Sequence, residues 1–560
     1  MFEDVISKGL EAQGLPAEVD VLQYANLLQY YEQMIGKFST RAAYTSLGRT
    51  LTFADLDRHA NAFAAYIQNH TQLKPGDRIA IQLPNIIQSP VTLLGSLRAG
   101  LVVVNTNPLY TAHELEHQFN DAGVKAMVVL ANLADTTAQV LANTPVETVI
   151  VTELADLHPA PKRQILNFVI KRIKKMVPDF NIEGAIAFTD VMKKGAKLQP
   201  TAVNPKIDDV AVLQYTGGTT GLAKGAMLTH GNILANTLQC APLFDSYGLQ
   251  EEACECIIQP LPLYHIYAFT VGLVILGKGA HTVLIPNPRD LPALIKDMSK
   301  WKFSGFCGLN TLFVALCANE DFKKLDFSGL KMTLSGGMAL TRFAAEQWKK
   351  ATGMDIYEGY GLTETSPVVS VNSGNGMRLG TIGVPVPSTH IDIRDDDGKT
   401  VAVGERGELC VKGPQVMKGY WKNDAATAES IIDGWFATGD VATLDEDGYL
   451  SIVDRKKDMI LVSGFNVFPN EVEDVACDHE NILEAAAIGV KDEHSGEVVH
   501  LYVVKTPADA TLTEKDVIAF CRESLAAYKV PKKVFFKTEL PKSNVGKILR
   551  RKVREEAEDA

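Results

Sequence analysis

The sequence predicts an α/β protein with mostly parallel sheets, divided into a large N-terminal domain and a small α+β C-terminal domain. Short apolar, β-branched runs at 78–83, 125–130 and 148–151 alternate with helical patterns at 53–68 and 111–122. Alternation of this kind is typical of βαβ units, whose strands pair in parallel. At 560 residues the chain is longer than one hydrophobic core usually supports, so we expect at least two domains.

The character of the sequence changes twice in its second half. Past about Ile382 the strands become shorter and Asp/Gly turns appear, as at 394–398, which predicts an antiparallel or barrel-like subdomain. A charged segment at 454–458 follows an apolar strand, and we expect a hinge there between domains 1–453 and 459–560. Beyond the hinge, helical and strand patterns are mixed, which predicts an α+β unit: helices near 469–476 and 513–527, strands near 484–490 and 500–505.

Composition and charge place the chain among ordinary globular proteins. Hydrophobic residues make up 46% of the sequence and charged residues 22%, without an internal repeat. The formal net charge of −12 argues against a surface built for nucleic acid, so we expect no nucleic-acid partner. The N-terminus lacks the features of a secretory signal, and the eight scattered cysteines suit a reducing compartment, so we expect a cytoplasmic protein.

The longest weakly charged run, 257–277, is nearly long enough to span a bilayer. It contains Gln259, Pro260, Pro262 and His265, which do not suit a spanning helix. We therefore expect a buried strand, a loop and a helix in this segment.

The strongest local signal is a strand at 210–216 that runs into a loop rich in glycine and threonine, with YTGGTTGLAKG at 215–225. Glycines let backbone N–H groups turn inward, the hydroxyls add donors and Lys224 adds positive charge, which together suit a polyphosphate such as that of ATP. The Gly-Lys-[Ser/Thr] ending of the common nucleotide loop is missing, which disfavours GTPases and kinases. Taken alone, the segment fits an ordinary glycine-rich turn equally well.

The loop at 215–225 resembles the phosphate loop of the adenylate-forming superfamily, which includes acyl-CoA synthetases, aryl-CoA ligases, luciferases and nonribosomal adenylation domains. Further motifs in the order of that superfamily extend from about Thr50 to Arg551, and residues before about Leu51 match no motif. The resemblance implies an N-terminal domain of two αβ subdomains and a β-barrel-like subdomain, followed by a mobile C-terminal domain. It also implies that the loop binds ATP through Thr216, Gly217, Gly218, Thr219, Thr220, Gly221 and Lys224.

Two further segments, SGGM at 335–338 and YEGYGLTET at 357–365, match motifs of the same family. The resemblance implies that Thr363 contacts the α-phosphate and that Glu364 helps to hold magnesium. Mg²⁺ prefers a carboxylate with phosphate oxygens, although Glu364 taken alone could equally be a loop carboxylate. The remaining nucleotide-binding positions implied here are Gly337 and the adenine-stacking segment Gly359, Tyr360 and Gly361.

The segment DGWFATGD at 433–440, continuing to IVDRKK at 452–457, resembles the signature of fatty acyl-CoA synthetases. The resemblance implies that Asp440 binds the ribose hydroxyls and that Arg455 assists the nucleotide. An aspartate with two acceptor oxygens suits a vicinal diol. Without the surrounding motif, Asp440 would be read as a turn residue after Gly439.

The segment PKSNVGKILR at 541–550 resembles the C-terminal motif whose lysine, here Lys547, catalyses adenylation. A flexible ammonium beside the Gly546 turn can reach both the fatty carboxylate and the α-phosphate, and it neutralises charge that would repel the nucleophile. A single lysine in a basic tail would be read as a surface residue, but here the whole motif is present.

The resemblance further implies two half-reactions in two conformations. A carboxylate is a poor acyl donor, so ATP is cleaved at the α-phosphorus to give acyl-AMP and pyrophosphate. The thiol of coenzyme A (CoA) then attacks the acyl carbonyl in a water-poor channel. We expect the small domain to swing about Lys457, presenting Lys547 first and then the loop of Gly464 and Phe465, which would form the CoA tunnel.

The segment LYHIYAF at 263–269 resembles the family segment that borders the acyl pocket. It implies that His265 lies near the carboxylate and that Tyr267 and Phe269 form the pocket wall and its gate, although both aromatics could equally be core residues. Apolar walls distinguish neighbouring chain lengths by only about 1 to 3 kcal/mol, so broad specificity is expected. The fatty acyl signature favours medium-to-long acids, with aryl acids, short acids or carrier-protein loading as alternatives.

A basic amphipathic segment at 162–177 bears on where the substrate is collected. It has no acidic residue, and a helix would place Ile165, Val169, Ile173 and Met176 on one stripe. Such a helix could lie on the anionic inner leaflet of a membrane, or it could pack on its own domain. A homodimer through the N-terminal domain is a further implication of the family resemblance.

Overall fold

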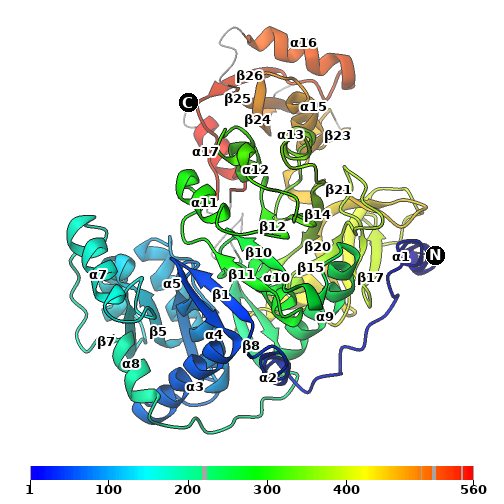
Figure 1. Ribbon diagram of the computed structural model, residues 1–560. Helices are drawn as coiled ribbons and strands as arrows, with labels where there is room; N and C mark the ends of the chain where they lie inside the picture. Colours follow the sequence, from blue (N-terminus) through cyan, green and yellow to red (C-terminus); the bar gives the residue numbers. More distant parts are fainter. Residues whose placement is uncertain are drawn as a thin grey trace.

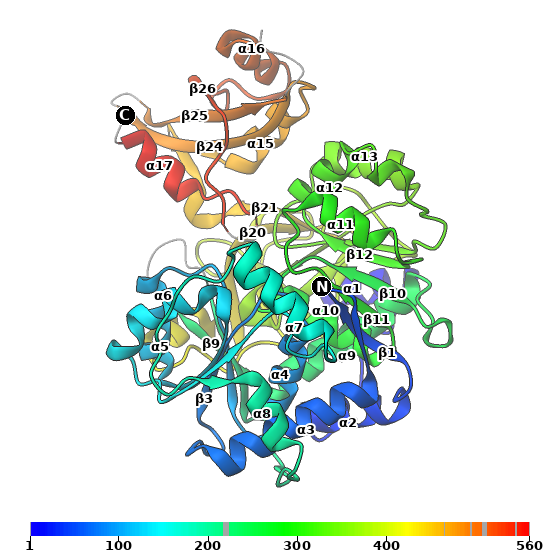
Figure 2. The ribbon, with the colours of Figure 1, turned by 60° about the vertical axis from the view of Figure 1, so that its left-hand side comes forward.

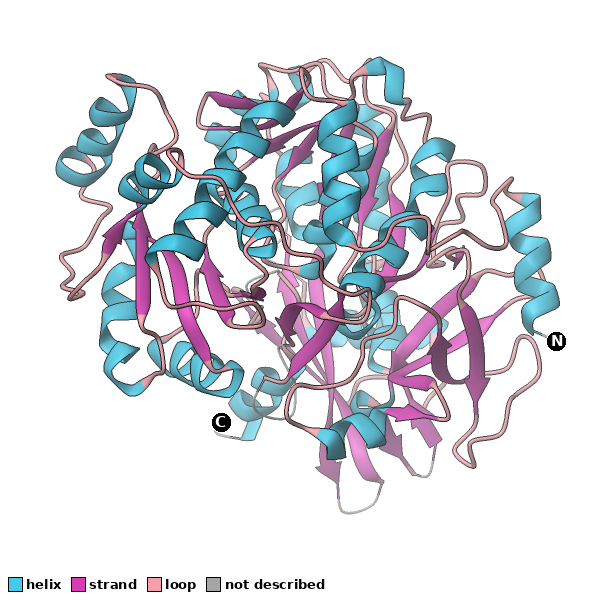
Figure 3. Cartoon of the chain, turned by 90° about the horizontal axis from the view of Figure 1, so that it is seen from below, coloured by secondary structure: helices cyan, strands magenta, loops and turns pink. Residues whose placement is uncertain are grey.

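The computed structural model forms a large N-terminal α/β domain and a small C-terminal domain (Figure 1). The residues that it describes are 2–216, 223–463, 465–492, 495–506, 512–543 and 546–558. Figure 3 shows helices on both sides of the strands in the large domain. Among the helices of the described ranges, none has the length and apolar character needed to cross a membrane.

The first sheet is parallel except at one edge, as the alternating pattern predicts. Within the described residues its order is β7 (Ile186–Ala187), β6 (Thr148–Thr152), β5 (Val124–Leu130), β3 (Arg78–Gln82), β4 (Val102–Asn105), β8 (Val210–Tyr215) and β9 (Gly225–Thr229). The pair β8 and β9 is antiparallel, and the other neighbours are parallel. The phosphate loop connects β8 to β9 at this edge.

The second sheet has a parallel centre and antiparallel ends. Its order in the described structure is β16 (Val384–Pro385), β15 (Val368–Val371), β14 (Tyr357–Gly361), β13 (Met332–Ser335), β12 (Gly305–Gly308), β10 (Cys256–Gln259), β11 (His281–Leu284), β1 (Ala42–Ser46) and β2 (Arg49–Thr52). Strands β1 and β2 come from the N-terminal segment in which the sequence shows no motif. The strand expected within 257–277 is β10, and the helix is α10 (Ile266–Gly277).

One hydrophobic core joins the two sheets through helices that lie between them. It contains side chains from both sheets and from α3 (Phe53–His70), α4 (Gln88–Arg98), α9 (His230–Ser246) and α10. Nearly every residue of α10 is buried, as expected for a helix that is apolar all round. The other helices of these two subdomains are α2 (Leu27–Lys37), α5 (Ala112–Ala122), α6 (Ala134–Val140), α7 (Lys162–Phe168), α8 (Phe188–Gly195), α11 (Leu291–Met298), α12 (Asn310–Cys317) and α13 (Arg342–Thr352).

Threonine capping boxes fix the start of several helices, including one that forms the site. Thr229, the last residue of β9, accepts the backbone N–H of Asn232, and the Asn232 side chain accepts the N–H of Thr229 in return. This reciprocal pair satisfies two donors that a helix start leaves unpaired. Helix α9 therefore begins directly at the end of a strand, with its direction set by the sheet.

The third sheet is antiparallel, as the Asp/Gly turns predict. Its strands in the described structure are β17 (His390–Arg394), β18 (Gly407–Lys412), β19 (Ile431–Ile432), β20 (Trp435–Leu444) and β21 (Leu450–Arg455), with α14 (Asp424–Ser430) before β19. Helix α1 (Phe2–Ala12) packs against this subdomain, far from α2, and buries Phe2, Ile6 and Leu10 (Figure 1). The N-terminal segment thus contributes to two subdomains.

The C-terminal domain combines one sheet with three helices in the described structure. The sheet contains β22 (Ile460–Val462), β23 (Phe465–Val467), β24 (Ile482–Asp492), β25 (Gly496–Lys505) and β26 (Lys533–Lys537). The helices are α15 (Pro469–Cys477), α16 (Glu514–Ser524) and α17 (Arg550–Glu558). In Figure 2 this domain stands apart from the large one, beyond β20 and β21, and the turn Lys456–Asp458 connects the two.

The basic segment 162–177 differs from the single helix that the sequence predicts. Helix α7 changes into a π-helical turn at Val169–Ile173, and the chain leaves the helix before Met176. A π turn inserts extra residues per turn, so the apolar side chains no longer follow a 3.6-residue stripe. The exposed apolar residues of the segment are Ile165, Phe168, Ile173 and Met176.

Candidate active site

A cavity of about 2090 Å³ lies between the two domains and is lined by residues of both. Its walls include the segments that follow β8, β10, β12, β13 and β14, at the carboxyl ends of parallel strands. In open α/β sheets, ligands bind in the crevice outside these strand ends. The cavity is therefore the candidate active site.

Most of the predicted site residues converge on this cavity, although they come from motifs that are far apart in sequence. They are Thr216, Lys224, His265, Tyr267, Gly337, Gly359, Tyr360, Gly361, Thr363, Glu364, Asp440, Arg455, Lys457 and Lys547. Gly217, Gly218, Thr219, Thr220, Gly221 and Gly464 lie outside the described residues.

The predicted nucleotide side of the cavity is organised around the buried carboxylate of Asp440. Strands β20 and β21 pair Asp440 directly with Arg455, whose Nε lies 3.1 Å from Asp440 Oδ1. The hydroxyl of Tyr360, from β14, donates to Oδ2 at 2.5 Å. Two neighbours thus hold the carboxylate in place, and each oxygen keeps a lone pair for a further donor.

A second group of side chains links the phosphate loop to the predicted magnesium ligand. Tyr420 donates its hydroxyl to Glu364 Oε1 at 2.8 Å, and the Nζ of Lys224 lies 5.0 Å from the centre of the Tyr420 ring. Burial raises the pKa of Glu364 above its usual value, while the Tyr420 hydrogen bond acts in the opposite direction. A cation near this carboxylate would restore its charged form. Sequence reasoning missed Tyr420, because it belongs to none of the recognised motifs.

Two glycines of the YEGYGLTET segment are required by the close approach of neighbouring backbone. A Cβ on Gly361 would lie 2.2 Å from the carbonyl oxygen of Pro367, and one on Gly359 would lie 3.1 Å from Val371. Strand β15 runs antiparallel to β14 at this point. These glycines therefore let β14 present Tyr360 to the cavity while its backbone packs tightly on β15.

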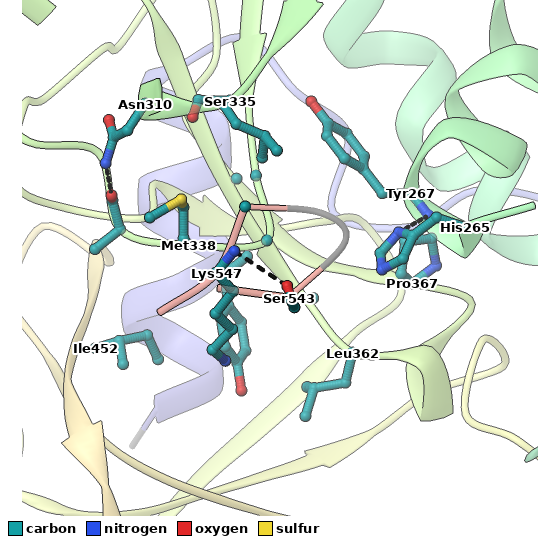
Figure 4. A pocket seen from close by; sticks show the side chains of 18 of the residues that line it. His265, Tyr267, Asn310, Ser335, Met338, Leu362, Pro367, Ile452, Ser543 and Lys547 are labelled. Carbon is teal, nitrogen blue, oxygen red and sulfur yellow. Dashed lines mark hydrogen bonds between the residues drawn. The ribbon is translucent and has the colours of Figure 1, made fainter. Parts of the chain in front are cut away.

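Lys547 enters the cavity from the C-terminal domain (Figure 4). Its backbone N–H donates to Ser543 Oγ at 3.1 Å, which stabilises the lysine loop. Burial and the nearby Arg455 lower the pKa of Lys547 to about 8, with Asp440 acting in the opposite direction. The structure therefore places Lys547, the predicted catalytic lysine, in the same cavity as Asp440 and Arg455.

His265 and Tyr267 lie at the start of α10 on the opposite side of the cavity (Figure 4). His265 caps this helix, because its Nδ1 accepts the backbone N–H of Tyr267 at 3.3 Å. Burial lowers the pKa of His265 to about 4, so the ring is neutral at physiological pH. Among the described side chains, Tyr267 Oη and Ser335 Oγ are buried polar atoms without a hydrogen-bond partner, and both residues line the cavity.

An apolar channel extends the cavity between α9 and α10. Each helix contributes one stripe with the spacing of a helical face. The residues are Cys240, Leu243 and Phe244 from α9, with Tyr247 directly after it, and Tyr267, Thr270, Val271 and Val274 from α10. Sequence reasoning missed most of these residues. Because α10 is apolar all round, no periodicity distinguishes its channel face from its core face.

Two predicted residues lie away from the cavity. Phe269 is on the other face of α10, in the core between the sheets, where it borders a separate small cavity of about 40 Å³. Phe465 is 57% exposed and stacks on Tyr528 of the C-terminal domain. The conformation therefore presents Lys547 to the site and keeps Phe465 of the predicted CoA loop outside it.

Comparisons with known proteins identify the family of the chain. The AMP-binding enzyme family matches residues 31–421, and the AMP-binding enzyme C-terminal domain matches residues 471–547. Proteins named long-chain-fatty-acid–CoA ligase from Salmonella typhimurium and Escherichia coli are 50% and 49% identical to this chain, and each alignment covers 97% of this chain and 96% of the relative.

A solved structure shares the fold over nearly its whole length. The crystal structure of the anthranilate CoA ligase AuaEII in complex with anthranoyl-AMP superposes with a TM-score of 0.83 at 25% identity, over 98% of this chain and 99% of that one. The two-domain architecture is therefore that of an adenylate-forming enzyme. The match over most of the sequence shows that this chain belongs to the AMP-binding enzyme family.

Proposed function

We propose that this chain is an ATP-dependent long-chain fatty acid–CoA ligase, which converts medium-to-long fatty acids to acyl-AMP and pyrophosphate and then to acyl-CoA. Its similarity to two proteins named long-chain-fatty-acid–CoA ligase, over nearly the whole chain, supports the assignment. The structural observation that supports it best is a single cavity that contains Lys547, the carboxylates of Glu364 and Asp440, and an apolar channel.

In the first half-reaction a carboxylate oxygen of the fatty acid attacks the α-phosphorus of ATP, and pyrophosphate leaves. Both reactants are anionic, so the ammonium of Lys547 would neutralise charge as they approach each other. Asp440 would accept the ribose hydroxyls, because Tyr360 and Arg455 already hold its carboxylate in position. The protein thus aligns the two reactants and reduces their mutual repulsion.

His265 and Tyr267 would hold the reacting end of the fatty acid. Because His265 Nδ1 accepts a backbone N–H, the proton of the neutral ring lies on Nε2, where it can be donated to a carboxylate or carbonyl oxygen. The buried Tyr267 hydroxyl has a free hydrogen-bonding capacity among the described residues. A polar head group at this point would leave the alkyl chain to enter the apolar channel.

We propose Mg²⁺ as the cofactor, with Glu364 as its protein ligand. The buried carboxylate, which shares its neighbour Tyr420 with Lys224, provides the hard oxygen that this cation prefers. Within the described part of the chain, no cluster of three or more His, Cys, Asp or Glu residues could hold a metal ion. The phosphates of ATP would therefore complete the coordination, and the bound ion would neutralise phosphate charge.

For the second half-reaction we propose that the C-terminal domain turns about Lys457. Lys457 lies in the short connection Lys456–Asp458, where a few backbone rotations can reorient a whole domain. The turn would withdraw Lys547 and bring the loop of Gly464 and Phe465 to the site as part of a CoA tunnel. The CoA thiolate then attacks the acyl carbonyl, and AMP leaves.

The channel between α9 and α10 is the proposed site of the alkyl chain. Its walls are mostly apolar, and the hydroxyls of Thr270 and Tyr247 are occupied, because they donate to the backbone carbonyl oxygens of Ser366 and Asn372. A wider side chain at Val271, midway along the α10 stripe, would shorten the space for the alkyl chain. Val271→Phe is therefore expected to shift the preferred substrate towards shorter acids. Phe269→Leu, on the opposite face of α10, tests the gate role that the resemblance assigns to Phe269.

The deciding assay is acyl-CoA formation from saturated acids of increasing length, with ATP, Mg²⁺ and CoA. We expect maximal activity with the longer chains and AMP and pyrophosphate as co-products. Parallel reactions with coumarate, with and without CoA, test the aryl-acid and carrier-loading alternatives. Activity confined to aromatic or short acids would overturn the fatty acid assignment but leave the adenylate chemistry intact.

We also propose that segment 162–177 contacts the cytoplasmic face of the inner membrane, in an otherwise cytoplasmic enzyme of fatty acid breakdown by β-oxidation. Its apolar side chains Ile165, Phe168 and Ile173 are 58%, 60% and 66% exposed. The basic residues around them are Lys162, Arg163, Lys171, Arg172, Lys174 and Lys175. Exposed apolar groups ringed by positive charge suit an anionic lipid surface.

Co-sedimentation with lipid vesicles tests the membrane contact. We expect binding to vesicles that contain phosphatidylglycerol and weaker binding to vesicles of phosphatidylcholine alone. The double substitution Phe168→Ser/Ile173→Ser should abolish the difference. Leu22→Ser, which alters a residue that is 74% exposed elsewhere on the domain, is the matched control. Equal binding of the double variant and of Leu22→Ser to the phosphatidylglycerol vesicles would show that the segment does not contact the membrane.

A homodimer through the N-terminal domain is a proposal that rests on the family resemblance. Sedimentation equilibrium over a range of protein concentrations is the direct measurement. A mass that stays at that of one chain, 61.0 kDa, would rule the dimer out.

A further inference from the structure

Arg550, the first residue of α17, lies at the centre of a buried ion cluster at the domain junction. Its side chain is 12% exposed. Within the C-terminal domain, Nε and Nη2 donate to the two carboxylate oxygens of Glu473 at 2.7 and 2.5 Å, and Nη2 also donates to Asn470. Nη1 donates to Asp454 Oδ1 at 3.2 Å and lies 3.6 Å from Asp458 Oδ2. One nitrogen of the guanidinium therefore binds the connection between the domains.

Asp454 connects this cluster to the nucleotide side of the cavity. It lies on β21, which pairs with β20, the strand that carries Asp440. The Asp454 side chain is fully buried, and its Oδ2 accepts the backbone N–H of Asn470, at the start of α15, at 2.6 Å. Asp454 is thus fixed by its strand to the large domain, while its carboxylate binds α15 and α17 of the small domain.

Lys547 is connected to this cluster through a short stretch of chain. Lys547 and Arg550 belong to one short segment, which leaves the lysine loop and enters α17 at Arg550. We propose that Arg550 and Asp454 form an interdomain latch that positions Lys547 for acyl-AMP formation and has to open before thioester formation. This inference rests on the proposed function, whose two half-reactions it assigns to the closed and open latch.

The latch acts on one conformation only. If the small domain turns about Lys457, Asp454 stays with β20 while Asn470 and Arg550 move away with their helices. A contact made in one of two conformations shifts the equilibrium between them, whereas a contact made in both does not. Loss of the latch should therefore slow the first half-reaction and leave the second unchanged or faster.

The two half-reactions can be measured separately on the full-length enzyme. ATP–pyrophosphate exchange in the presence of palmitate reports acyl-AMP formation, and the reaction of synthetic palmitoyl-AMP with CoA reports thioester formation. We expect Arg550→Gln and Asp454→Asn each to slow the exchange about tenfold to a hundredfold, since small displacements of a catalytic group have effects of this size. Thioester formation should keep its wild-type rate.

Conservative and control variants separate positioning from general stability. Arg550→Lys keeps the positive charge but lacks the planar guanidinium group that donates to several partners at once. Compared with Arg550→Gln, it should therefore recover more of the wild-type melting temperature than of the wild-type exchange rate. Arg522→Gln, an exposed arginine on α16 at the far end of the same domain, should leave both rates unchanged (Figure 1). Combining Arg550→Gln with Lys547→Ala should slow the exchange no further than Lys547→Ala alone, because the latch acts through Lys547.

The possible results are distinct. Equal loss of both half-reactions in Arg550→Gln and Asp454→Asn, or an unchanged exchange rate, would overturn the latch. Additive losses in the Arg550→Gln/Lys547→Ala enzyme would show that Arg550 does not act through the lysine. If the wild-type enzyme forms no acyl-AMP from any fatty acid, the proposed function itself fails and the latch falls with it.

Discussion

At the scale of single residues, we expect the surroundings of Lys547 to set the pH range of the first half-reaction. Burial, together with Arg455 and Arg550, lowers its pKa to about 8, while Asp440 and Asp458 act in the opposite direction. If the ammonium is the active form, kcat/KM for acyl-AMP formation should be constant at neutral pH and fall as the pH rises through about 8. ATP–pyrophosphate exchange measured between pH 6 and 10 gives this profile.

Two substitutions test the assignment of that pH profile to Lys547. Lys547→Ala should reduce the exchange by about 100-fold to 1000-fold, the range found when an electrostatic stabiliser is removed. Lys547→Arg keeps a positive charge throughout this range, so its residual activity should not decline near pH 8. A wild-type rate that rises through pH 8 would instead indicate a neutral amine acting as a base.

Glu358, on β14 beside Tyr360, makes stability depend on pH. Burial raises its pKa to about 8, and Asp474 of the C-terminal domain adds to this effect. The folded protein therefore binds more protons than the unfolded chain between about pH 4.5 and 8, so this residue lowers stability as the pH rises through that range. Glu358→Gln removes the effect and keeps an acceptor for the Leu340 N–H, which donates to Oε1 at 2.8 Å.

We expect Glu358→Gln to have the melting temperature of the wild type at pH 5. At pH 8 its melting temperature should be higher, with a free energy of unfolding larger than that of the wild type by on the order of a few kcal/mol. Differential scanning calorimetry at the two pH values is the measurement. Glu346→Gln, on the exposed face of α13, is the control and should alter both values equally. A gain at pH 5 as large as that at pH 8 would mean that the carboxylate is ionised throughout.

The residues that sequence reasoning identified share one property: each belongs to a motif with several fixed neighbours. The motifs predict a nucleotide-binding role for Asp440 and Arg455 without knowledge of their pairing in β20 and β21. Tyr420 could not, because its contacts with Glu364 and Lys224 join three separate segments and leave no local pattern. Side chains whose role arises from tertiary contact alone are not visible in one sequence.

At the scale of elements, α10 shows where periodicity fails as a guide. The strand, loop and helix expected in 257–277 are present, because prolines and polar residues interrupt the run. Which face of the helix lines the cavity could not be predicted, since Val271 on the channel face and Phe269 on the core face are both apolar and buried. Only the position of α9 distinguishes the two faces. In 162–177 the sequence pattern predicts one continuous helical stripe, which the π turn at Val169–Ile173 interrupts.

The docking of α1 on the third subdomain depends on a close approach at Gly9. A Cβ at this position would lie 2.6 Å from the carbonyl oxygen of Asp447 and 3.3 Å from Gly448 Cα, so Gly9→Ala would push the helix away from the turn. We expect a loss of about 1 to 3 kcal/mol. Gly36→Ala, in a helix of the same length with no atom within 4 Å of the new Cβ, should instead stabilise by roughly 0.5 to 1 kcal/mol.

Thermal unfolding of the two variants, with limited proteolysis of the segment between α1 and α2, measures this docking. Gly9→Ala should lower the melting temperature and speed cleavage of that segment, whereas Gly36→Ala should do neither. A Gly9→Ala enzyme that is stabilised like Gly36→Ala would show that α1 contributes little to the folded domain.

At the scale of the whole molecule, the alternating pattern predicts parallel sheets but not how the N-terminal segment completes them. Residues before Leu51 match no motif, yet β1 joins the second sheet beside β11, and α1 packs on the third subdomain. Both contacts join parts of the chain that are far apart in sequence. Their energy depends on surfaces formed by other segments, so local propensity does not reveal them.

The arrangement of the two domains can be tested by fixing it. A Cβ on Gly546, in the lysine loop, would lie 3.3 Å from Thr311 Oγ1 on α12 of the large domain, which is within the span of a disulfide. The double variant Gly546→Cys/Thr311→Cys should therefore form a crosslink that holds Lys547 in the cavity. We expect the oxidised enzyme to make acyl-AMP at a rate comparable to that of its reduced form. Its rate of thioester formation from synthetic acyl-AMP should fall by at least about 90%, because that step requires the domain to turn. Dithiothreitol should restore it, and each single variant should be indifferent to oxidant. An oxidised enzyme that completes both half-reactions would show that the domain turn is not required.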